Sequence, residues 1–197
     1  MSYVIVGLGN PGEEYAQTRH NTGRIVLDYF RKKYDFSEWE ENKKLRALAS
    51  EGKIGKTKTI LLEPETFMNK SGLSVKPLIT SKKKAEKLAV IYDDLDLPLG
   101  TFKISFNKGT GGHKGLESVA KNIKTKEFIR VRVGISQATP KGKLKKPRGE
   151  QKILDYLMAD FSKKDLEFLK KIKPKIAQAL KVIILEGRQR AMNMFNR

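Results

Sequence analysis

This chain of 197 residues contains two histidines, and they are the first candidates for catalytic residues. His20 lies in the polar segment QTRHNTG, and His113 lies in the glycine-rich segment KGTGGHKG. An imidazole titrates near neutral pH and can act as a general base. Asp93 and Asn10 each follow a predicted buried strand, and Asn69 follows an apolar pair. Together these residues could supply a base, a carboxylate that holds its tautomer, and amides that orient a carbonyl group and a water.

Each of these polar residues also has a plainer interpretation. Asp93, Asp94 and Asp96 could form an ordinary acidic turn, or they could hold Mg²⁺ as in a nuclease. A metal site is disfavoured because the chain has two histidines, no cysteine and no second acidic cluster. Asn69 could cap a helix that begins before Ser71, although an N-cap region also presents free backbone N–H groups to a ligand.

The N-terminal glycines invite a comparison with dinucleotide-binding proteins. Gly7, Gly9 and Gly12 follow an apolar run with the spacing G-x-G-x-x-G. That fingerprint requires a helix after the last glycine and an acidic residue about 20 positions later, at the end of a second strand. Here a polar segment follows Gly12, and Asp28 lies inside a predicted amphipathic helix. We therefore predict no Rossmann domain; the glycines shape a turn that delivers Asn10.

The elements that must position these residues follow an alternating pattern of strands and helices, which predicts an α/β fold. Strands are expected at 3–7, as a pair within 46–62, and at 88–92, 101–106 and 128–135. Helices are expected at 24–33, 70–80, 116–123 and 162–186, the last with a capping box of Ser162 and Asp165, a stop at Gly187, and a kink or break at Pro174. Without repeats or a long linker, residues 1–197 are expected to form a single domain.

The charge balance points to a polyanionic partner. Lys and Arg number 41 against 22 Asp and Glu, a formal net charge of +19. A lysine-rich surface of a heat-adapted protein is the alternative, but so one-sided a bias favours nucleic acid. Lys108 and Lys114 flank the glycine-rich segment, which is expected to open a helix and attract an anion. No apolar run reaches membrane-spanning length, so we expect a soluble cytoplasmic protein.

Four segments carry a resemblance to a known family. In order, VGLGNPGEEYAQTRHNTG, PETFMNKSG, YDDLDLPLG and GGHKGLES resemble the signature segments of bacterial peptidyl-tRNA hydrolase, and so does the terminal GRQRAMNMFN. The resemblance covers nearly the whole chain. It implies one α/β domain with a twisted mixed sheet flanked by helices. It also implies hydrolysis, without metal or cofactor, of the ester that joins a peptide to the 3′ ribose of tRNA.

The same resemblance assigns expected roles to individual residues. It implies His20 as the base, Asp93 as its support, and Asn10 as a residue that helps distinguish N-blocked from free aminoacyl groups. We expect the Asn10 side chain to accept from the blocked amide. Lys114 departs from the family, which commonly has Asn there; an ammonium only donates, and we expect it to reach the peptide side of the substrate. The expected substrate- and tRNA-contacting set is Tyr15, Phe67, Met68, Asn69, Lys103, His113, Lys114 and Arg132.

The expected partner is peptidyl-tRNA, contacted at its acceptor stem and 3′ end by a monomer. Lys103, Arg130 and Arg132, on neighbouring predicted strands, are expected to add to the attraction for its phosphates. Two other classes remain: a non-catalytic RNA-binding protein on the same fold, and a metal-dependent nuclease. The joint presence of His20 and Asp93 argues against the first, and a chelator would expose the second.

Overall fold

The computed structural model describes residues 2–196. Its strands are β1 (Tyr3–Gly7), β2 (Glu40–Asn42), β3 (Ala47–Ile54), β4 (Thr57–Pro64), β5 (Leu88–Pro98), β6 (Phe102–Phe106), β7 (Ile129–Ala138) and β8 (Leu144–Lys145). They form one eight-stranded sheet in the order β2-β3-β4-β1-β5-β7-β6, with β8 paired to β7. In this order the neighbouring strands β4, β1, β5 and β7 run parallel to one another. Strand β3 pairs antiparallel with β4, and β6 pairs antiparallel with β7. The expected mixed sheet is confirmed.

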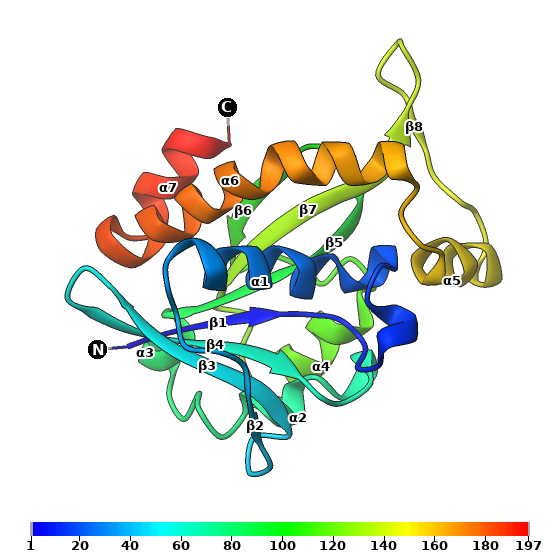
Figure 1. Ribbon diagram of the computed structural model, residues 1–197. Coiled ribbons are helices and arrows are strands. Elements are labelled where there is room, and N and C mark those ends of the chain that lie inside the picture. The colour runs from blue at the N-terminus through cyan, green and yellow to red at the C-terminus, as the bar shows by residue number, and fades with distance from the viewer. Residues whose placement is uncertain (1, 197) are drawn as a thin grey trace.

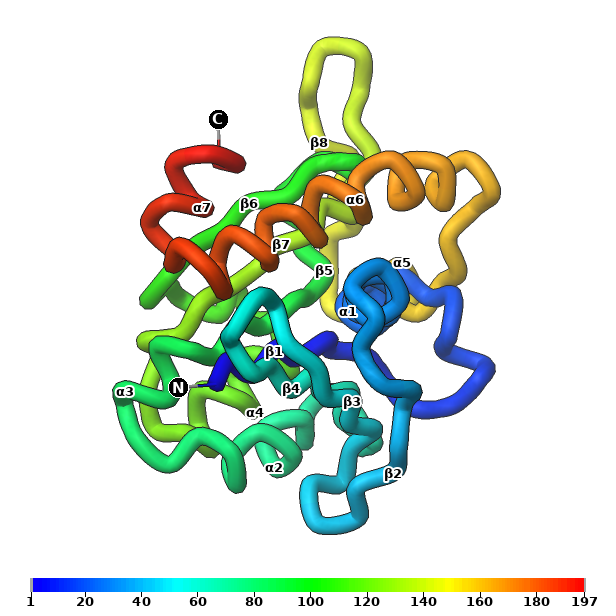
Figure 2. The backbone as a smooth tube through the Cα atoms, turned by 60° about the vertical axis from the view of Figure 1, so that its left-hand side comes forward, coloured from blue at the N-terminus to red at the C-terminus, as the bar shows by residue number. Residues whose placement is uncertain are grey.

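Helices cover both faces of this sheet, giving three layers (Figures 1 and 2). The helices are α1 (Thr22–Lys33), α2 (Gly72–Val75), α3 (Lys82–Ala85), α4 (Lys114–Ile123), α5 (Glu150–Met158), α6 (Lys163–Glu186) and α7 (Arg188–Phe195). Residues of α1, α6 and α7 pack in one apolar cluster, and residues of α2 and α4 pack in the other. Within residues 2–196, no helix is long and apolar enough to cross a membrane.

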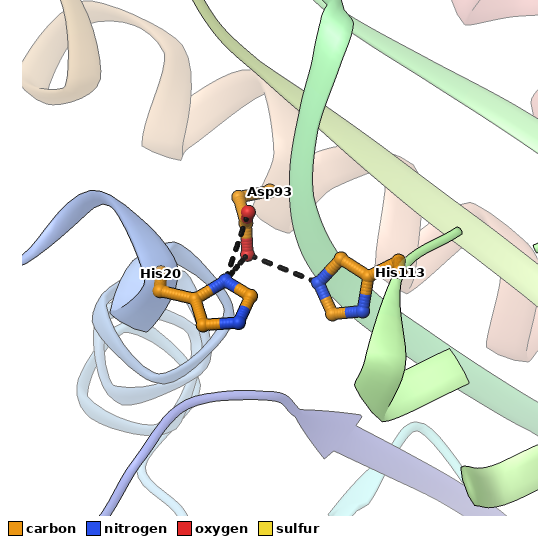
Figure 3. A group of neighbouring side chains, drawn as sticks. All are labelled: His20, Asp93 and His113. Carbon is orange, nitrogen blue, oxygen red and sulfur yellow. Dashed lines mark hydrogen bonds and ion pairs between the residues drawn. The ribbon is translucent and has the colours of Figure 1, made fainter. Parts of the chain in front are cut away.

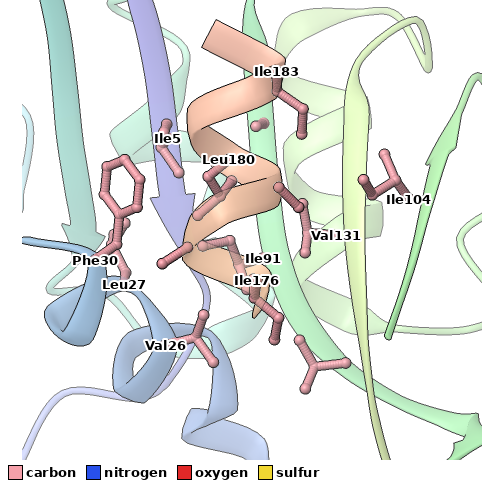
Figure 4. Close-up of a cluster of buried hydrophobic side chains, with 14 of the residues drawn as sticks. Ile5, Val26, Leu27, Phe30, Ile91, Ile104, Val131, Ile176, Leu180 and Ile183 are labelled. Atoms are coloured by element: carbon pink, nitrogen blue, oxygen red, sulfur yellow. The ribbon is translucent and has the colours of Figure 1, made fainter. Parts of the chain in front are cut away.

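The alternation of side chains along the central strands separates these two clusters. On β1, Ile5 belongs to the cluster under α1 and α6, while Val4 and Val6 belong to the cluster under α4. Figure 4 shows the first cluster, where Ile176 and Leu180 of α6 face the sheet. Because the parallel strands are buried on both faces, they read as nearly continuous apolar runs in the sequence.

The structure corrects several sequence expectations. The helix expected at 70–80 is only a 3₁₀ turn, Met68–Lys70, followed by the four-residue α2; Pro77 disfavours a helical conformation at the residue before it. Strand β5 continues to Pro98, so the acidic residues after Tyr92 extend a strand instead of forming a turn. Helix α6 has the expected capping box and ends at Gly187, but it continues through Pro174 without breaking into two helices. Helices α3, α5 and α7 and the short strands β2 and β8 lie outside the predicted elements.

Two glycines explain why α1 approaches β1 so closely. A Cβ atom on Gly7 would lie 2.6 Å from the carbonyl oxygen of Gly23, and one on Gly23 would lie 2.4 Å from that of Ile91. No side chain fits at either position. A 3₁₀ turn, Glu13–Tyr15, follows Gly12 where a dinucleotide-binding fold requires a helix. The glycines thus bring the N-terminus of α1 onto the ends of β1 and β5, where the candidate residues lie.

Candidate active site

His20, Asp93 and His113 come together at the carboxyl edge of the sheet (Figure 3). His20 lies in the 3₁₀ turn Arg19–Asn21, Asp93 lies on β5, and His113 is the N-cap residue of α4. His20 Nδ1 is 3.0 and 3.1 Å from the two carboxylate oxygens of Asp93, and His113 Nε2 is 3.2 Å from Oδ1. Asp93 is only 3% exposed and His20 only 8%, so the group is almost closed to solvent.

Hydrogen bonds fix the tautomers of both histidine rings. The backbone N–H of Leu116 donates to His113 Nδ1 at 3.3 Å, so this nitrogen must be unprotonated. His113 therefore carries its proton on Nε2 and donates to Asp93. Because the Asp93 carboxylate only accepts, neutral His20 donates from Nδ1 and keeps a lone pair on Nε2. This is the arrangement that a general base requires.

The electrostatics of the group support the same assignment. Burial alone would lower the pKa of His20, but the charge of Asp93 and its hydrogen bond outweigh burial and raise that pKa above its ordinary value. For Asp93, burial raises the pKa, but the two histidines lower it by more, so the pKa lies far below its usual range. Asp93 therefore remains a carboxylate and can stabilise the imidazolium that forms when His20 takes a proton.

Asn10 is held by bonds on its backbone and its side chain. Its backbone N–H donates to Asn21 Oδ1 at 2.8 Å, and its carbonyl accepts from Asn21 Nδ2 at 2.9 Å. The Asn10 Oδ1 accepts from the backbone N–H of Met68 at 2.8 Å. The donor Nδ2 is left facing the sulfur of Met158 at 3.9 Å. The side-chain oxygen thus uses one of its two lone pairs on Met68, and the acceptor role expected from the sequence stays a prediction.

The turn that carries His20 is fastened to a distant part of the chain by Arg19. The Arg19 guanidinium donates to the carbonyls of Ala159 and Asp160 at 3.1 and 2.9 Å, and it pairs with Asp165 at 3.0 Å. Asp165 also completes the capping box of α6. Sequence reasoning missed Arg19 and Asn21, although both flank His20 directly; their role depends on partners that no local pattern identifies.

The segment PETFMNKSG forms the neighbouring wall of the site. Met68 is buried, and its N–H reaches Asn10, whereas Phe67 is 58% exposed and Asn69 is also exposed. Asn69 lies inside the Met68–Lys70 turn, so the helix-capping interpretation is wrong. Tyr15 ends the Glu13–Tyr15 turn and is partly exposed. Apolar and amide surface therefore adjoins Asn10.

Four basic residues of the β6–α4 segment and of β7 form what we call the cationic rim: Lys103, Lys108, Lys114 and Arg132. Lys103 and Arg132 are cross-strand neighbours on β6 and β7, and Arg132 pairs with Asp94 at 2.7 Å. Lys114 is exposed, and its amine lies 3.9 Å from Glu117. Arg130 does not join the rim, contrary to expectation, because it is fully buried against the Phe128 ring.

Among the described residues, His20, Asp93 and His113 are the group whose ligand atoms could hold a metal ion, since these atoms lie within 4.8 Å of one another. In the structure both histidines bond to Asp93. The other acidic residues of the segment are paired with cations: Asp94 with Arg132, and Asp96 with Lys146. The carboxylates that a nuclease would use to bind Mg²⁺ are therefore already paired with basic side chains.

Comparison with known proteins places this site in a family. The model of the peptidyl-tRNA hydrolase family matches residues 4–197. The chain belongs to the peptidyl-tRNA hydrolase family. It is 40% identical over 200 residues to a peptidyl-tRNA hydrolase of Thermodesulfovibrio yellowstonii, covering 98% of both chains. It is 38% identical over 194 residues to one of Clostridium perfringens, covering 98% of this chain and 96% of that protein.

Solved structures agree with the family and with its fold. The crystal structure of a peptidyl-tRNA hydrolase from Acinetobacter baumannii superposes with a TM-score of 0.87 at 29% identity, covering 99% of this chain and 94% of that one. The peptidyl-tRNA hydrolase resemblance seen in the sequence motifs is therefore confirmed. So is the prediction of an α/β fold with a mixed sheet flanked by helices.

Proposed function

We propose that this chain hydrolyses the ester between a peptide and the 3′ ribose of tRNA, with His20 as the general base. The observation that carries the proposal is the bond between His20 Nδ1 and Asp93, which leaves Nε2 with a lone pair. Such a base can take a proton from a water as the water attacks the ester carbonyl. The fold and the family membership agree with this chemistry.

The reaction divides into two proton transfers. In the first, water attacks the ester carbon while His20 Nε2 takes its proton, and the Asp93 carboxylate stabilises the resulting imidazolium. In the second, the tetrahedral intermediate collapses, the bond to the ribose oxygen breaks, and His20 returns the proton to that oxygen. The products are a peptide with a free carboxylate and a tRNA with a free 3′ hydroxyl. Donors near the carbonyl oxygen lower the barrier by stabilising its developing charge.

Asn10 supports selectivity for N-blocked substrates through its Nδ2 donor, whose contact in the structure is the weakly accepting sulfur of Met158 at 3.9 Å. A peptide or an acetylated amino acid has a carbonyl next to its nitrogen, and that carbonyl can accept from Asn10 Nδ2. A free aminoacyl group instead carries an ammonium, which only donates and would meet a donor. The oxygen of the side chain is already bonded to Met68 and contributes less.

The tRNA contact is proposed at the acceptor stem and 3′ end, along the cationic rim. Tyr15, Phe67, Met68 and Asn69 would line the peptide side, whereas Lys103, Lys114 and Arg132 would face phosphates. His113 differs from this set because its ring is bonded to Asp93 and to the N-terminus of α4, so we propose that it supports Asp93. One chain supplies every residue, as a monomer requires, and a tRNA substrate fits a cytoplasmic location.

The deciding experiment is release of N-acetyl amino acid from N-acetyl-aminoacyl-tRNA, with and without EDTA. We expect release in both conditions, with the tRNA left intact and able to be charged again. A non-catalytic RNA-binding protein would bind the substrate without release. A metal-dependent nuclease would shorten the tRNA and would stop in EDTA. Either of these results would contradict the proposal.

A further inference from the structure

We propose that Arg24 is a positioning residue that fixes Asn10 for the proposed reaction, and that Glu63 and Glu65 fix Arg24 in turn. Arg24 lies in the first turn of α1, and its Nη1 donates to the carbonyl of Asn10 at 3.0 Å. Its Nε pairs with Glu63 at 3.1 Å, and its Nη2 pairs with Glu65. Because Asn10 acts in the proposed ester hydrolysis, this inference rests on that function.

The guanidinium is fixed in orientation because three of its nitrogens have separate acceptors. A planar fork with three partners cannot rotate without losing a charge-assisted bond. The side chains of Arg24 and Glu63 are only 13% and 7% exposed, so water competes poorly for these bonds. The side chain of Glu65 is 34% exposed and lies on the solvent side of the cluster. Arg24 is therefore a rigid support instead of a mobile surface cation.

The chain also makes room for this arginine beside Asn10. A Cβ atom on Gly9 would lie 2.7 Å from Cδ and 2.8 Å from Cγ of Arg24. Any side chain at position 9 would push the arginine stem away from the Asn10 carbonyl. The second glycine of the G-x-G pattern thus serves the contact between α1 and Asn10.

Arg24 adds a charged hydrogen bond to Asn10 that Asn21 cannot provide. Asn21 bonds the backbone N–H and carbonyl of Asn10 through a neutral amide, while Arg24 adds a cationic donor to the same carbonyl. Removing the cation would also strand Glu63, whose Oε1 has no hydrogen-bond partner among the described residues. Lysine at position 24 keeps a cation near Glu63, but an ammonium is a point charge and cannot reproduce the fork.

The test is Arg24→Lys, with Arg31→Lys as its matched control. Arg31 lies on the same helix and is also buried, and it pairs with Asp28 and Glu38 but contacts no residue of the proposed site. Both changes are made in the native chain and in Asn10→Ala, and kcat/KM is measured with N-acetyl-aminoacyl-tRNA. We expect Arg24→Lys to lower kcat/KM about tenfold in the native background and to change nothing further in Asn10→Ala. Arg31→Lys should have little effect in either.

Two results would overturn the inference: an equal loss from Arg24→Lys in both backgrounds, or the same loss from Arg31→Lys. The ¹⁵N resonance of the Asn10 side chain provides a readout that does not need turnover. It should move in Arg24→Lys and remain in place in Arg31→Lys; an unmoved resonance contradicts the positioning role. A moved resonance in a chain that releases no N-acetyl amino acid would instead mean that the proposed function fails. If Arg24→Lys does not fold, Glu63→Gln enters the same cycle, with a smaller expected loss that again vanishes in Asn10→Ala.

Discussion

The histidine–aspartate corner (His20, Asp93, His113 and Asn10) and the cationic rim lie side by side but are built in opposite ways. In the corner, buried polar groups are bonded to side chains and backbone groups from distant segments. In the rim, Asp94 holds Arg132 at 2.7 Å, but Lys114 has one loose contact, and in the loop before it a Cβ on Gly111 would meet nothing within 4 Å. The nearby segment 139–149 extends away from the body of the molecule (Figure 2). Buried charges interact strongly and at fixed distances, whereas exposed charges act through their sum and are screened by salt.

The largest effect should come from His20, on which both proton transfers depend. Loss of a general base typically lowers the rate about 10²–10⁴-fold. His20→Ala should therefore lose at least this much in kcat, measured as N-acetyl amino acid release, while tRNA affinity changes little because the rim is intact. Near-native turnover by this variant would show that the corner is not the catalytic centre.

Asp93→Asn should reduce the rate by about 10²-fold or more and should also move the pH profile. The Asp93 charge raises the pKa of His20, so removing it lets burial lower that pKa. The acidic limb of the kcat/KM profile should then shift to lower pH. The plateau should fall, because an amide cannot stabilise the imidazolium and can turn its own donor toward Nδ1, which moves the histidine proton to Nε2. A profile unchanged in position and height would make Asp93 a structural residue only.

A smaller effect is expected from Asn10→Ala, which should narrow the preference for N-acetylated over free aminoacyl-tRNA. One hydrogen bond to the blocking carbonyl is worth about tenfold in discrimination. The measurement is the ratio of kcat/KM values for the two substrates. Asn122→Ala is the matched control, because Asn122 bonds the carbonyl of Ser118 on α4 and has no role in the proposed site. An unchanged ratio in Asn10→Ala would remove its role in selectivity.

Features encoded by local sequence patterns could be predicted, whereas bonds between distant segments could not. The buried strands are apolar runs in the sequence. Asp93 follows one such run and His20 precedes a helix, so the rule that sites gather at the carboxyl ends of strands predicts that the two residues lie close together. The bonds of Arg19 to the α5–α6 junction and of Arg24 to Glu63 join residues 39 to 146 positions apart, and no local pattern encodes them. The burial of Arg130 could not be predicted either, because its alternation with Arg132 suggests one exposed face.

The smallest effect should come from Lys114→Asn, which tests how the rim works. The structure points the Lys114 amine toward solvent and Glu117, so we now expect it to meet a phosphate instead of the peptide side. Each neutralised phosphate contributes about −0.9 to the log–log slope of duplex affinity against salt. Lys114→Asn should therefore make the slope shallower by about one unit and leave kcat unchanged. Lys181→Asn, on the opposite face of the sheet, should leave the slope as it is. If Lys114→Asn instead keeps the slope and alters KM or kcat, Lys114 contacts the peptide and belongs with the corner instead of the rim.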